Sequence, residues 1–251
     1  METLKYAQFT AQRIEPWPWI GKEKALAFLD IFDKADLLLR RYGTSDARTF
    51  PLDNNIEKYL QLWNERGYII LKAPTPWRLL VMVMMFNIGT SYITVFINDK
   101  YFEDPLRTKA FMRLVKSIYT WGNIDHGFVL HEDESDEKNA FLVGVHKISG
   151  GHRLELCLPG IYWINLFGPR YVEWFGERRF QTLSAYERER MPDGGQLVLT
   201  RPTLLPFNDK ASIKFEKGIK KHLGNRAFFD KKHPGWNTNA PKFAKERGIA
   251  S

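Results

Sequence analysis

The segment LPGIYWINLFGPRYVEWFG, from Leu158 to Gly176, is built like a structural element and not like a reaction site. It carries one cation and one carboxylate, and it has no Ser, Cys or His to act as a nucleophile or metal ligand. Large aromatic rings supply much of the buried area of a core. We therefore expect a buried strand that turns into a short helix. The residues assigned to this structural motif are Trp163, Phe167, Gly168, Pro169, Tyr171 and Trp174.

Apolar residues at helical spacing predict further helices on both sides of this segment. The predicted helices are Ala25 to Leu39 with Gly43 at or just beyond the end, Asp53 to Gly67, Asp104 to Trp121, and Asn208 to Leu223. Asp104 followed by Pro105 is typical of a helix N-terminus.

Runs rich in β-branched and aromatic residues predict strands between these helices. The predicted strands are 3–13, 78–87, 90–98, 127–130, 140–146, 153–158, 184–191 and 195–201. This order indicates an α+β fold, with an antiparallel or mixed sheet flanked by helices. Two hairpin-then-helix units leave open an internal repeat of two similar halves. We expect one domain over residues 1–224 and a basic, irregular C-terminal segment over residues 225–251.

The composition indicates a globular protein of the cytoplasm. Its longest apolar run, LLVMVMMF from Leu79 to Phe86, is far shorter than the roughly 20 residues that span a bilayer. The N-terminus shows no basic region followed by an apolar core, so we expect no secretory signal. The single cysteine, Cys157, lies in an apolar stretch and is expected to be buried and free.

No motif in the chain predicts catalysis, and we expect no catalytic residue, no cofactor and no metal. The chain has no GxxxxGK[ST], GxGxxG or GxSxG motif. Four histidines lie close together in sequence without an HxxxH or CxxC spacing: His126, His131, His146 and His152. Asp136 to Lys138 and Glu216-Lys217 contain the residue types of a metal-dependent nuclease, but they lie in a polar loop and on a helix, where convergence on one metal is not expected.

Charge is distributed unevenly along the chain. The segment from Asp209 to Ser251 has eleven Lys/Arg against four Asp/Glu. Its cations alternate with four aromatic residues, Phe228, Phe229, Trp236 and Phe243, so a basic nucleic-acid-binding module is the alternative function. We favour the simpler interpretation, in which Phe228 and Phe229 close the core and the lysines are solvated. An acidic loop has the opposite charge, with carboxylates at Glu132, Asp133, Glu134, Asp136 and Glu137.

Three stretches of the chain resemble bacterial immunity proteins of polymorphic toxin systems, in particular the family called Immunity protein 52. They are PGIYWINLFGPRYVEWFG, DKADLLLRRYGTSDARTFPLDNNIEKYLQLWNERG from Asp33 to Gly67, and GGQLVLTRPTLLPFNDKASIKFEKGIKKHLG from Gly194 to Gly224. The second contains Gly43, Ser45 and Ala47 in the Gly-x-Ser-x-Ala turn of that family. The aromatic start of the family is only approximated here by Trp17-Pro18-Trp19.

The resemblance implies a cytoplasmic, non-enzymatic protein that binds and neutralises a type VI secretion toxin encoded by a neighbouring gene. In that family the toxin is often a nuclease. We expect the acidic loop, Glu132 to Glu137, to dock on basic residues of the toxin, because a nuclease channel is made to hold anions. A loop that is merely solvated stays the alternative.

Overall fold

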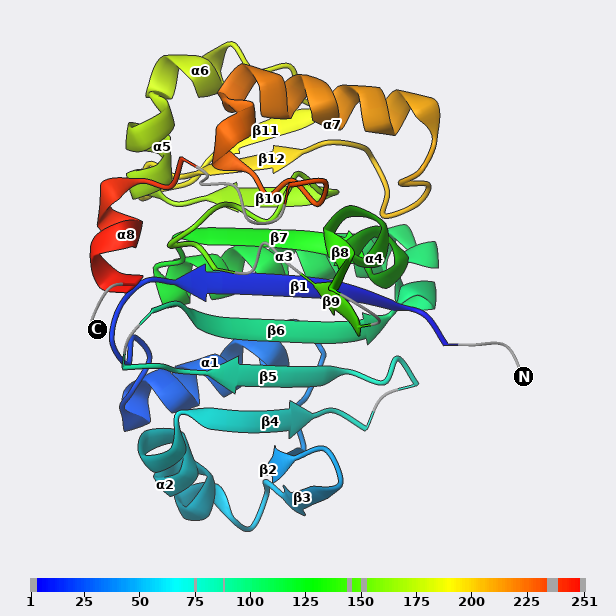
Figure 1. Ribbon diagram of the computed structural model, residues 1–251. Coiled ribbons are helices and arrows are strands. Elements are labelled where there is room, and N and C mark those ends of the chain that lie inside the picture. The colour runs from blue at the N-terminus through cyan, green and yellow to red at the C-terminus, as the bar shows by residue number, and fades with distance from the viewer. Residues whose placement is uncertain are drawn as a thin grey trace. The chain divides into compact units, whose positions relative to one another are not determined.

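The computed structural model describes residues 4–74, 76–87, 89–143, 146–149, 153–233 and 239–248. His152 and Trp236, discussed above, lie outside the described residues. The chain divides into two compact units, Met1–Asn87 with Ser91–Ile124, and Ile88–Thr90 with Asp125–Ser251. Each unit combines antiparallel strands with flanking helices (Figure 1), which confirms the predicted α+β class.

In its described residues, the first unit contains six strands in the order β1-β6-β5-β4-β2-β3. Consecutive strands in that order are antiparallel. Burial alternates along β5, where Val81 and Val83 are fully buried while Leu80 and Met82 are half-buried, so one face of the sheet forms the core. The strands are β1 (Tyr6–Arg13), β2 (Arg41–Ser45), β3 (Arg48–Pro51), β4 (Tyr68–Lys72), β5 (Leu80–Met84) and β6 (Ser91–Asn98).

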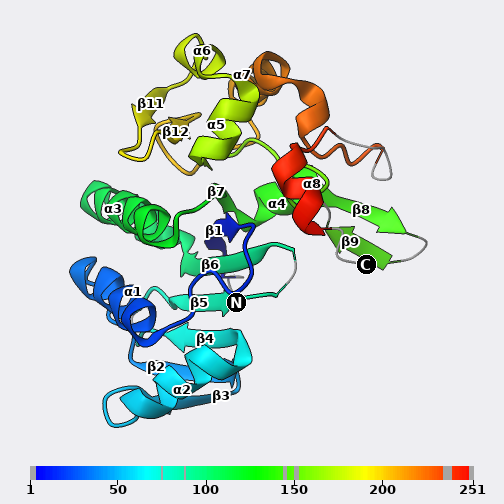
Figure 2. The same ribbon diagram turned by 90° about the vertical axis from the view of Figure 1, so that its left-hand side faces the viewer.

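Aromatic rings join the three α-helices of the first unit, among which α1 and α3 run side by side (Figure 2). The Phe28 ring lies 5.4 Å from that of Trp63 and 4.9 Å from that of Trp121. Offset and edge-on ring pairs of this kind add to the stabilisation that burial gives. The helices are α1 (Lys22–Lys34), α2 (Ile56–Arg66) and α3 (Pro105–Gly122), with a short 3₁₀ helix, η1 (Asp99–Glu103), before α3.

Two expectations for the first unit are wrong. The first helix ends at Lys34 and not near Leu39, because Asp36 adopts a left-handed backbone (φ 58°) that breaks the helix. The chain then forms the β2–β3 hairpin, so Gly43 lies in a strand. The second predicted helix begins at Ile56 and not at Asp53, with Asn55 directly before its first turn.

The second unit contains four strands in the order β11-β12-β10-β7 and a separate hairpin of β8 and β9. Its strands are β7 (His126–His131), β8 (Ala140–Val143), β9 (His146–Ser149), β10 (Ile164–Phe167), β11 (Glu187–Arg190) and β12 (Gln196–Leu199). Its helices are α4 (Glu132–Asn139), α5 (Pro169–Phe175), α6 (Glu177–Gln181), α7 (Lys210–Leu223) and α8 (Lys242–Gly248), with the 3₁₀ helix η2 (Asn225–Ala227) after α7.

The aromatic segment of the sequence forms β10 and α5 in the second unit. β10 pairs with β7 on one side and with β12 on the other. Phe167 is fully buried and its ring lies 5.2 Å from that of Phe180. The Trp163 indole is buried and donates a hydrogen bond to the Arg201 carbonyl at 3.1 Å. The segment therefore connects the centre of the sheet to the loop that follows β12.

Two expectations for the second unit are also wrong. The acidic loop is the helix α4, since its side chains cap and pair within the helix. Residues 153–158 form turns and not a strand, apart from a single bridge between Leu158 and Phe228. That bridge joins the segment after Gly224 to the second unit. The domain boundary at residue 224 stays a prediction. Among the described residues, no helix is both long enough and apolar enough to cross a membrane.

Replacing Gly67 by Ala should destabilise the fold because Gly67 closes α2 in a left-handed conformation (φ 60°). An added Cβ would lie 2.3 Å from the Trp17 ring and 2.7 Å from the Met85 carbonyl oxygen. We expect the free energy of unfolding to fall by about 2–3 kcal/mol in urea denaturation. Gly194→Ala is the control, since Gly194 has φ 93° but nothing within 4 Å of an added Cβ. Equal losses in the two variants would contradict this account.

Candidate functional site

The acidic segment folds into α4 because its first residues cap their own helix. The side chain of His131 accepts a hydrogen bond from the Asp133 amide at 3.3 Å, and the Glu134 carboxylate accepts one from the His131 amide at 3.4 Å. This reciprocal arrangement is a capping box. Carboxylates in the first turn also interact favourably with the positive end of the helix dipole. The two effects give α4 a fixed beginning directly after β7.

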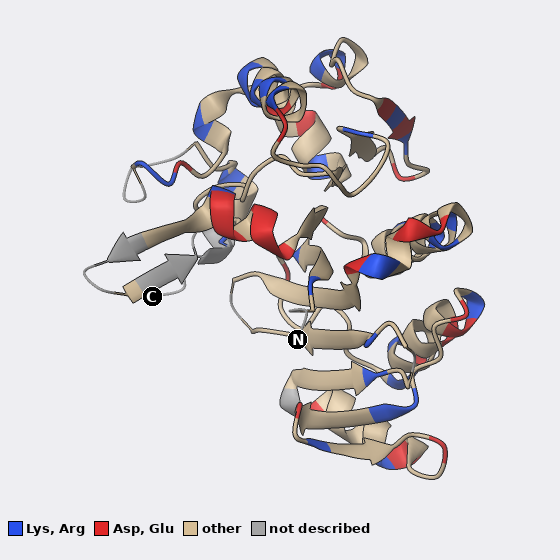
Figure 3. Ribbon diagram, turned by 90° about the vertical axis from the view of Figure 1, so that its right-hand side faces the viewer, with Lys and Arg blue, Asp and Glu red and all other residues tan. Residues whose placement is uncertain are grey.

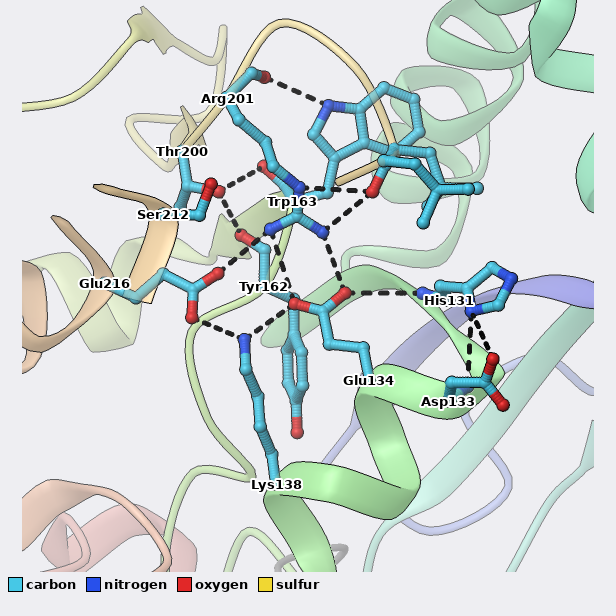
Figure 4. A network of polar contacts seen from close by, with 12 residues as sticks. His131, Asp133, Glu134, Lys138, Tyr162, Trp163, Thr200, Arg201, Ser212 and Glu216 are labelled. Atoms are coloured by element: carbon cyan, nitrogen blue, oxygen red, sulfur yellow. Dashed lines mark hydrogen bonds and ion pairs between the residues drawn. The ribbon is translucent and has the colours of Figure 1, made fainter. Parts of the chain in front are cut away.

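Glu134 is the inward-facing member of the acidic segment and joins a network of four charged side chains (Figure 4). The Arg201 guanidinium lies between two carboxylates, with Nη2 2.8 Å from Glu134 Oε2 and Nη1 2.9 Å from Glu216 Oε1. The Lys138 ammonium also contacts both, 2.6 Å from Glu134 Oε1 and 2.5 Å from Glu216 Oε2. We call Glu134, Lys138, Arg201 and Glu216 the buried quartet.

Backbone carbonyls satisfy the donors that remain in the buried quartet. Arg201 donates to the Leu204 carbonyl from Nε at 3.2 Å and from Nη2 at 3.0 Å. Lys138 donates to the Ile161 carbonyl at 2.9 Å, and its ammonium lies 5.0 Å from the centre of the Tyr162 ring. The quartet therefore links α4, the start of the aromatic segment, the loop after β12, and α7.

The charges of the buried quartet balance within a site that excludes most water. The exposed fraction of the side chain is 0% for Glu134, 5% for Arg201, 6% for Glu216 and 19% for Lys138. Burial raises the pKa of the Glu216 carboxyl, and Lys138 opposes that shift. Charges in such a place are tolerated only when paired and hydrogen-bonded. The quartet can hold elements together, and its carboxylates are already paired with cations.

The five predicted partner-binding residues divide between the surface and the interior. Glu134 is buried in the quartet, while Asp136 and Glu137 are exposed and Glu132 and Asp133 are half-buried. Figure 3 shows the Asp and Glu positions of α4 as red bands along the short helix. The surface that α4 offers to a partner therefore consists of four carboxylates on a rigid helix. We call Glu132, Asp133, Asp136 and Glu137 the α4 surface.

Sequence reasoning missed the buried quartet. It considered Lys138 and Glu216 only as candidates for nuclease chemistry, and it passed over Arg201. Two signals were present: the i, i+4 spacing of Glu134 and Lys138, and the position of Glu216 on the same face of α7 as Ile219 and Leu223. The pairing of these groups over 67 and 78 residues of chain depends on the tertiary fold.

One of the candidate histidines and three of the candidate aromatic residues pack within the second unit. His126 is fully buried, and burial lowers its pKa to about 3, so this imidazole is neutral. Phe228 is buried, the Phe229 ring lies 5.8 Å from Phe141, and the Phe243 ring lies 5.2 Å from Tyr171. Phe228 is thus part of the core, while Phe229 and Phe243 are half-buried against other aromatic rings. Within the described part of the chain, no three His, Cys, Asp or Glu residues are grouped so that they could hold a metal ion.

No family model matches the chain, and no curated protein matches it. The resemblance to Immunity protein 52 therefore stays a prediction. Among solved structures, the chain is similar to Pseudomonas aeruginosa T6SS protein PA0821, with a TM-score of 0.55 and 11% sequence identity. The likeness covers 98% of this chain and 82% of that one. At this identity it shows that the two proteins share a fold.

Removing one member of the buried quartet should cost far more stability than removing a surface charge. We expect Arg201→Met to lower the free energy of unfolding by about 3–5 kcal/mol, because Glu134 and Glu216 lose a buried partner. Arg190→Met is the matched control, since Arg190 pairs with Glu177 on the surface and its loss should cost at most about 1 kcal/mol. Equal losses in urea denaturation would show that the quartet does not stabilise the unit.

Lys220, next to the quartet on α7, should make stability rise with pH. Burial lowers its pKa to about 8, and Lys138 adds to that shift. In the unfolded chain this lysine keeps its proton up to about pH 10.4. Between pH 8 and 10 the unfolded state therefore binds more protons than the folded state, so raising the pH in this range favours the folded state. In the parent protein we expect this lysine to raise the free energy of unfolding by about 2 kcal/mol between pH 7 and 9.5. Lys220→Met should lack that rise. Identical pH profiles for the variant and the parent would contradict this.

Proposed function

We propose that this protein is an immunity protein of a type VI secretion system, which binds a cognate toxin directly and neutralises it without catalysis. The observation that carries the proposal is the fold shared with a T6SS protein along 98% of this chain. The resemblance of three segments to immunity proteins supports the more specific part of the proposal, namely that the protein binds and neutralises a toxin. The partner is a toxin encoded by a neighbouring gene, and the place of action is the cytoplasm.

The α4 surface supports a nuclease as that toxin. A nuclease channel is lined with cations that hold phosphates, and four carboxylates on one short helix carry the opposite charge to those cations. Such complementarity speeds encounter and adds specificity more than it adds affinity. The carboxylates that contact the partner are Glu132, Asp133, Asp136 and Glu137. Glu134 acts indirectly, because it fixes α4 through Arg201 and Lys138.

An α4 helix that is already folded favours binding, because less conformational entropy is lost when the complex forms. Side chains on a flexible loop lose conformational freedom on association, whereas a helix that is already in place loses less. The capping box fixes the N-terminal end of α4, and the contacts of Lys138 with Glu216 and the Ile161 carbonyl fix its C-terminal end. The buried quartet thus holds in place the helix whose surface the proposed function depends on.

Neutralising the α4 surface should weaken toxin binding and protection together. In a variant with Gln or Asn at Glu132, Asp133, Asp136 and Glu137, we expect about a tenfold to hundredfold loss of affinity for the toxin and a weaker dependence on salt. The neighbouring gene product, made with an inactivating substitution, serves as the ligand in titration calorimetry. Growth of a bacterial host that expresses the active toxin reports protection.

The matched control removes four carboxylates from the exposed surface of α1 and α2, so that both variants have the same net charge. The control positions are Glu23, Asp30, Glu57 and Glu65. The proposal expects this control to bind and protect like the parent. If both variants bind alike, α4 is not the docking surface; if the parent itself neither binds the toxin nor protects the host, the immunity function is wrong.

A further inference from the structure

The second unit contains a groove that the proposed function does not use. It lies between α7 and the segment Thr182–Ser184, which follows α6, and its volume is about 420 Å³. The residues that α7 contributes are Ala211, Lys214, Phe215, Gly218, Ile219 and His222. Their spacing of three and four residues places them on one face of the helix. A cavity of this size has room for a large apolar side chain from a partner.

The walls of the groove are apolar, and a lysine lies at its edge. Leu183, Phe215 and Ile219 supply apolar surface, and Lys214 and His222 are exposed beside it. Among the residues that the structure describes, no carboxylate lines the groove. The one acidic residue within α7 is Glu216, which points away into the buried quartet and is neutralised there. No carboxylate of α7 is therefore exposed, whereas Lys210, Lys214, Lys217 and Lys221 are.

Gly218 is the least expected residue in the groove. It lies in the interior of α7, where Gly is a poorer helix former than any other residue except Pro. An added Cβ at this position would meet nothing within 4 Å, so no internal packing within the described structure demands a glycine. The missing side chain widens the groove at the middle of its helical wall. An intermolecular contact would account for a glycine that the fold of this unit does not need.

One end of the groove is fixed by contacts between α7 and the residues of α6 and just after it. Arg179 donates from Nη1 to the Leu223 carbonyl at 2.8 Å, and the His222 ring lies 2.8 Å from the Arg179 carbonyl and 3.3 Å from the Thr182 hydroxyl. These contacts join the C-terminal turn of α7 to the residues that precede the opposite wall. The groove is thus formed before a partner arrives, which lowers the cost of binding.

We infer that this groove is a docking site for an acidic protein segment, which inserts a Leu-sized or Phe-sized side chain beside Gly218 and places carboxylates against Lys214 and the neighbouring cations of α7. The charge of the rim selects an acidic partner, and the apolar walls select a protein segment over a nucleic acid. The inference rests on the proposed function only in naming the toxin as the bearer of this segment. The groove supplies a second contact with the toxin, and the charge at its edge is opposite to that of the α4 surface.

A library of random twelve-residue peptides displayed on phage tests the groove without assuming the identity of the toxin. Peptides are selected on the full chain at about 0.15 M salt and then measured individually by fluorescence polarisation. We expect the selected peptides to pair a Leu or aromatic residue with two or more Asp or Glu. They should bind Gly218→Leu at least tenfold more weakly than the parent, because the leucine fills the groove.

Two variants separate groove filling from changes in helix stability and in overall charge. Gly218→Ala strengthens α7 in the same way as Gly218→Leu but adds only a methyl group, so it should bind within about threefold of the parent. Lys214→Gln should weaken binding about threefold to fivefold, whereas Lys109→Gln on the exposed face of α3 removes the same charge elsewhere and should change nothing. Thermal unfolding of each variant checks that the fold is intact.

Several results would overturn the inference. It fails if no peptide is selected, if the selected peptides lack acidic residues, or if Gly218→Leu binds them as well as the parent does. It also fails if a 20-nucleotide single strand of DNA binds the parent and loses affinity tenfold in Gly218→Leu, since the occupant would then be a nucleic acid. If acidic peptides bind in the groove but the neighbouring gene product does not bind the chain, the groove stands and the proposed function fails.

Discussion

The pairing of Arg201 with Glu134 and Glu216, completed by Lys138, is the interaction on which the functional interpretation depends. It places two acidic and two basic groups in a nearly dry interior, where each would be costly without the others. The cluster fixes the position of α4 relative to α7. Glu134 orients the helix whose other carboxylates face outward. Glu216 removes the only negative charge of α7 from its outer side, so one cluster prepares two surfaces of opposite charge.

The proposed function requires surfaces that are complementary to one partner, and we propose two such surfaces on this chain. The α4 surface suits cations such as those of a nucleic-acid channel, and the groove beside Gly218 suits an acidic segment with an apolar anchor. Opposite charges on two surfaces also exclude partners that match only one of them. An apolar anchor in a preformed groove lowers the dissociation rate, whereas exposed charges mainly raise the association rate. In the proposed complex, the two contacts would together give both fast encounter and a long lifetime.

Local sequence signals predicted much of the fold. Asp104-Pro105 correctly placed the start of α3, and the aromatic segment from Ile161 correctly predicted β10 followed by α5. The errors occurred where the backbone or tertiary contacts decide: the left-handed Asp36 ended α1 early, and capping by His131 and Glu134 turned an expected loop into α4. The docking role of the α4 carboxylates was predicted from their charge together with the resemblance to immunity proteins, and it stays a prediction. Arg201 was not recognised, because its partners lie 67 residues earlier and 15 residues later in the chain and only the folded sheet brings them together.

The most direct test of the central claim is co-purification of this chain with the product of the gene beside it, washed at about 0.5 M salt, where the Debye length is only a few ångströms. Surface ion pairs contribute little under these conditions, so a complex that persists depends on shape and apolar contact. The account predicts a stoichiometric complex in which the toxin is inactive. A chain that elutes alone, while the neighbouring protein stays toxic in its presence, would contradict the assignment as an immunity protein.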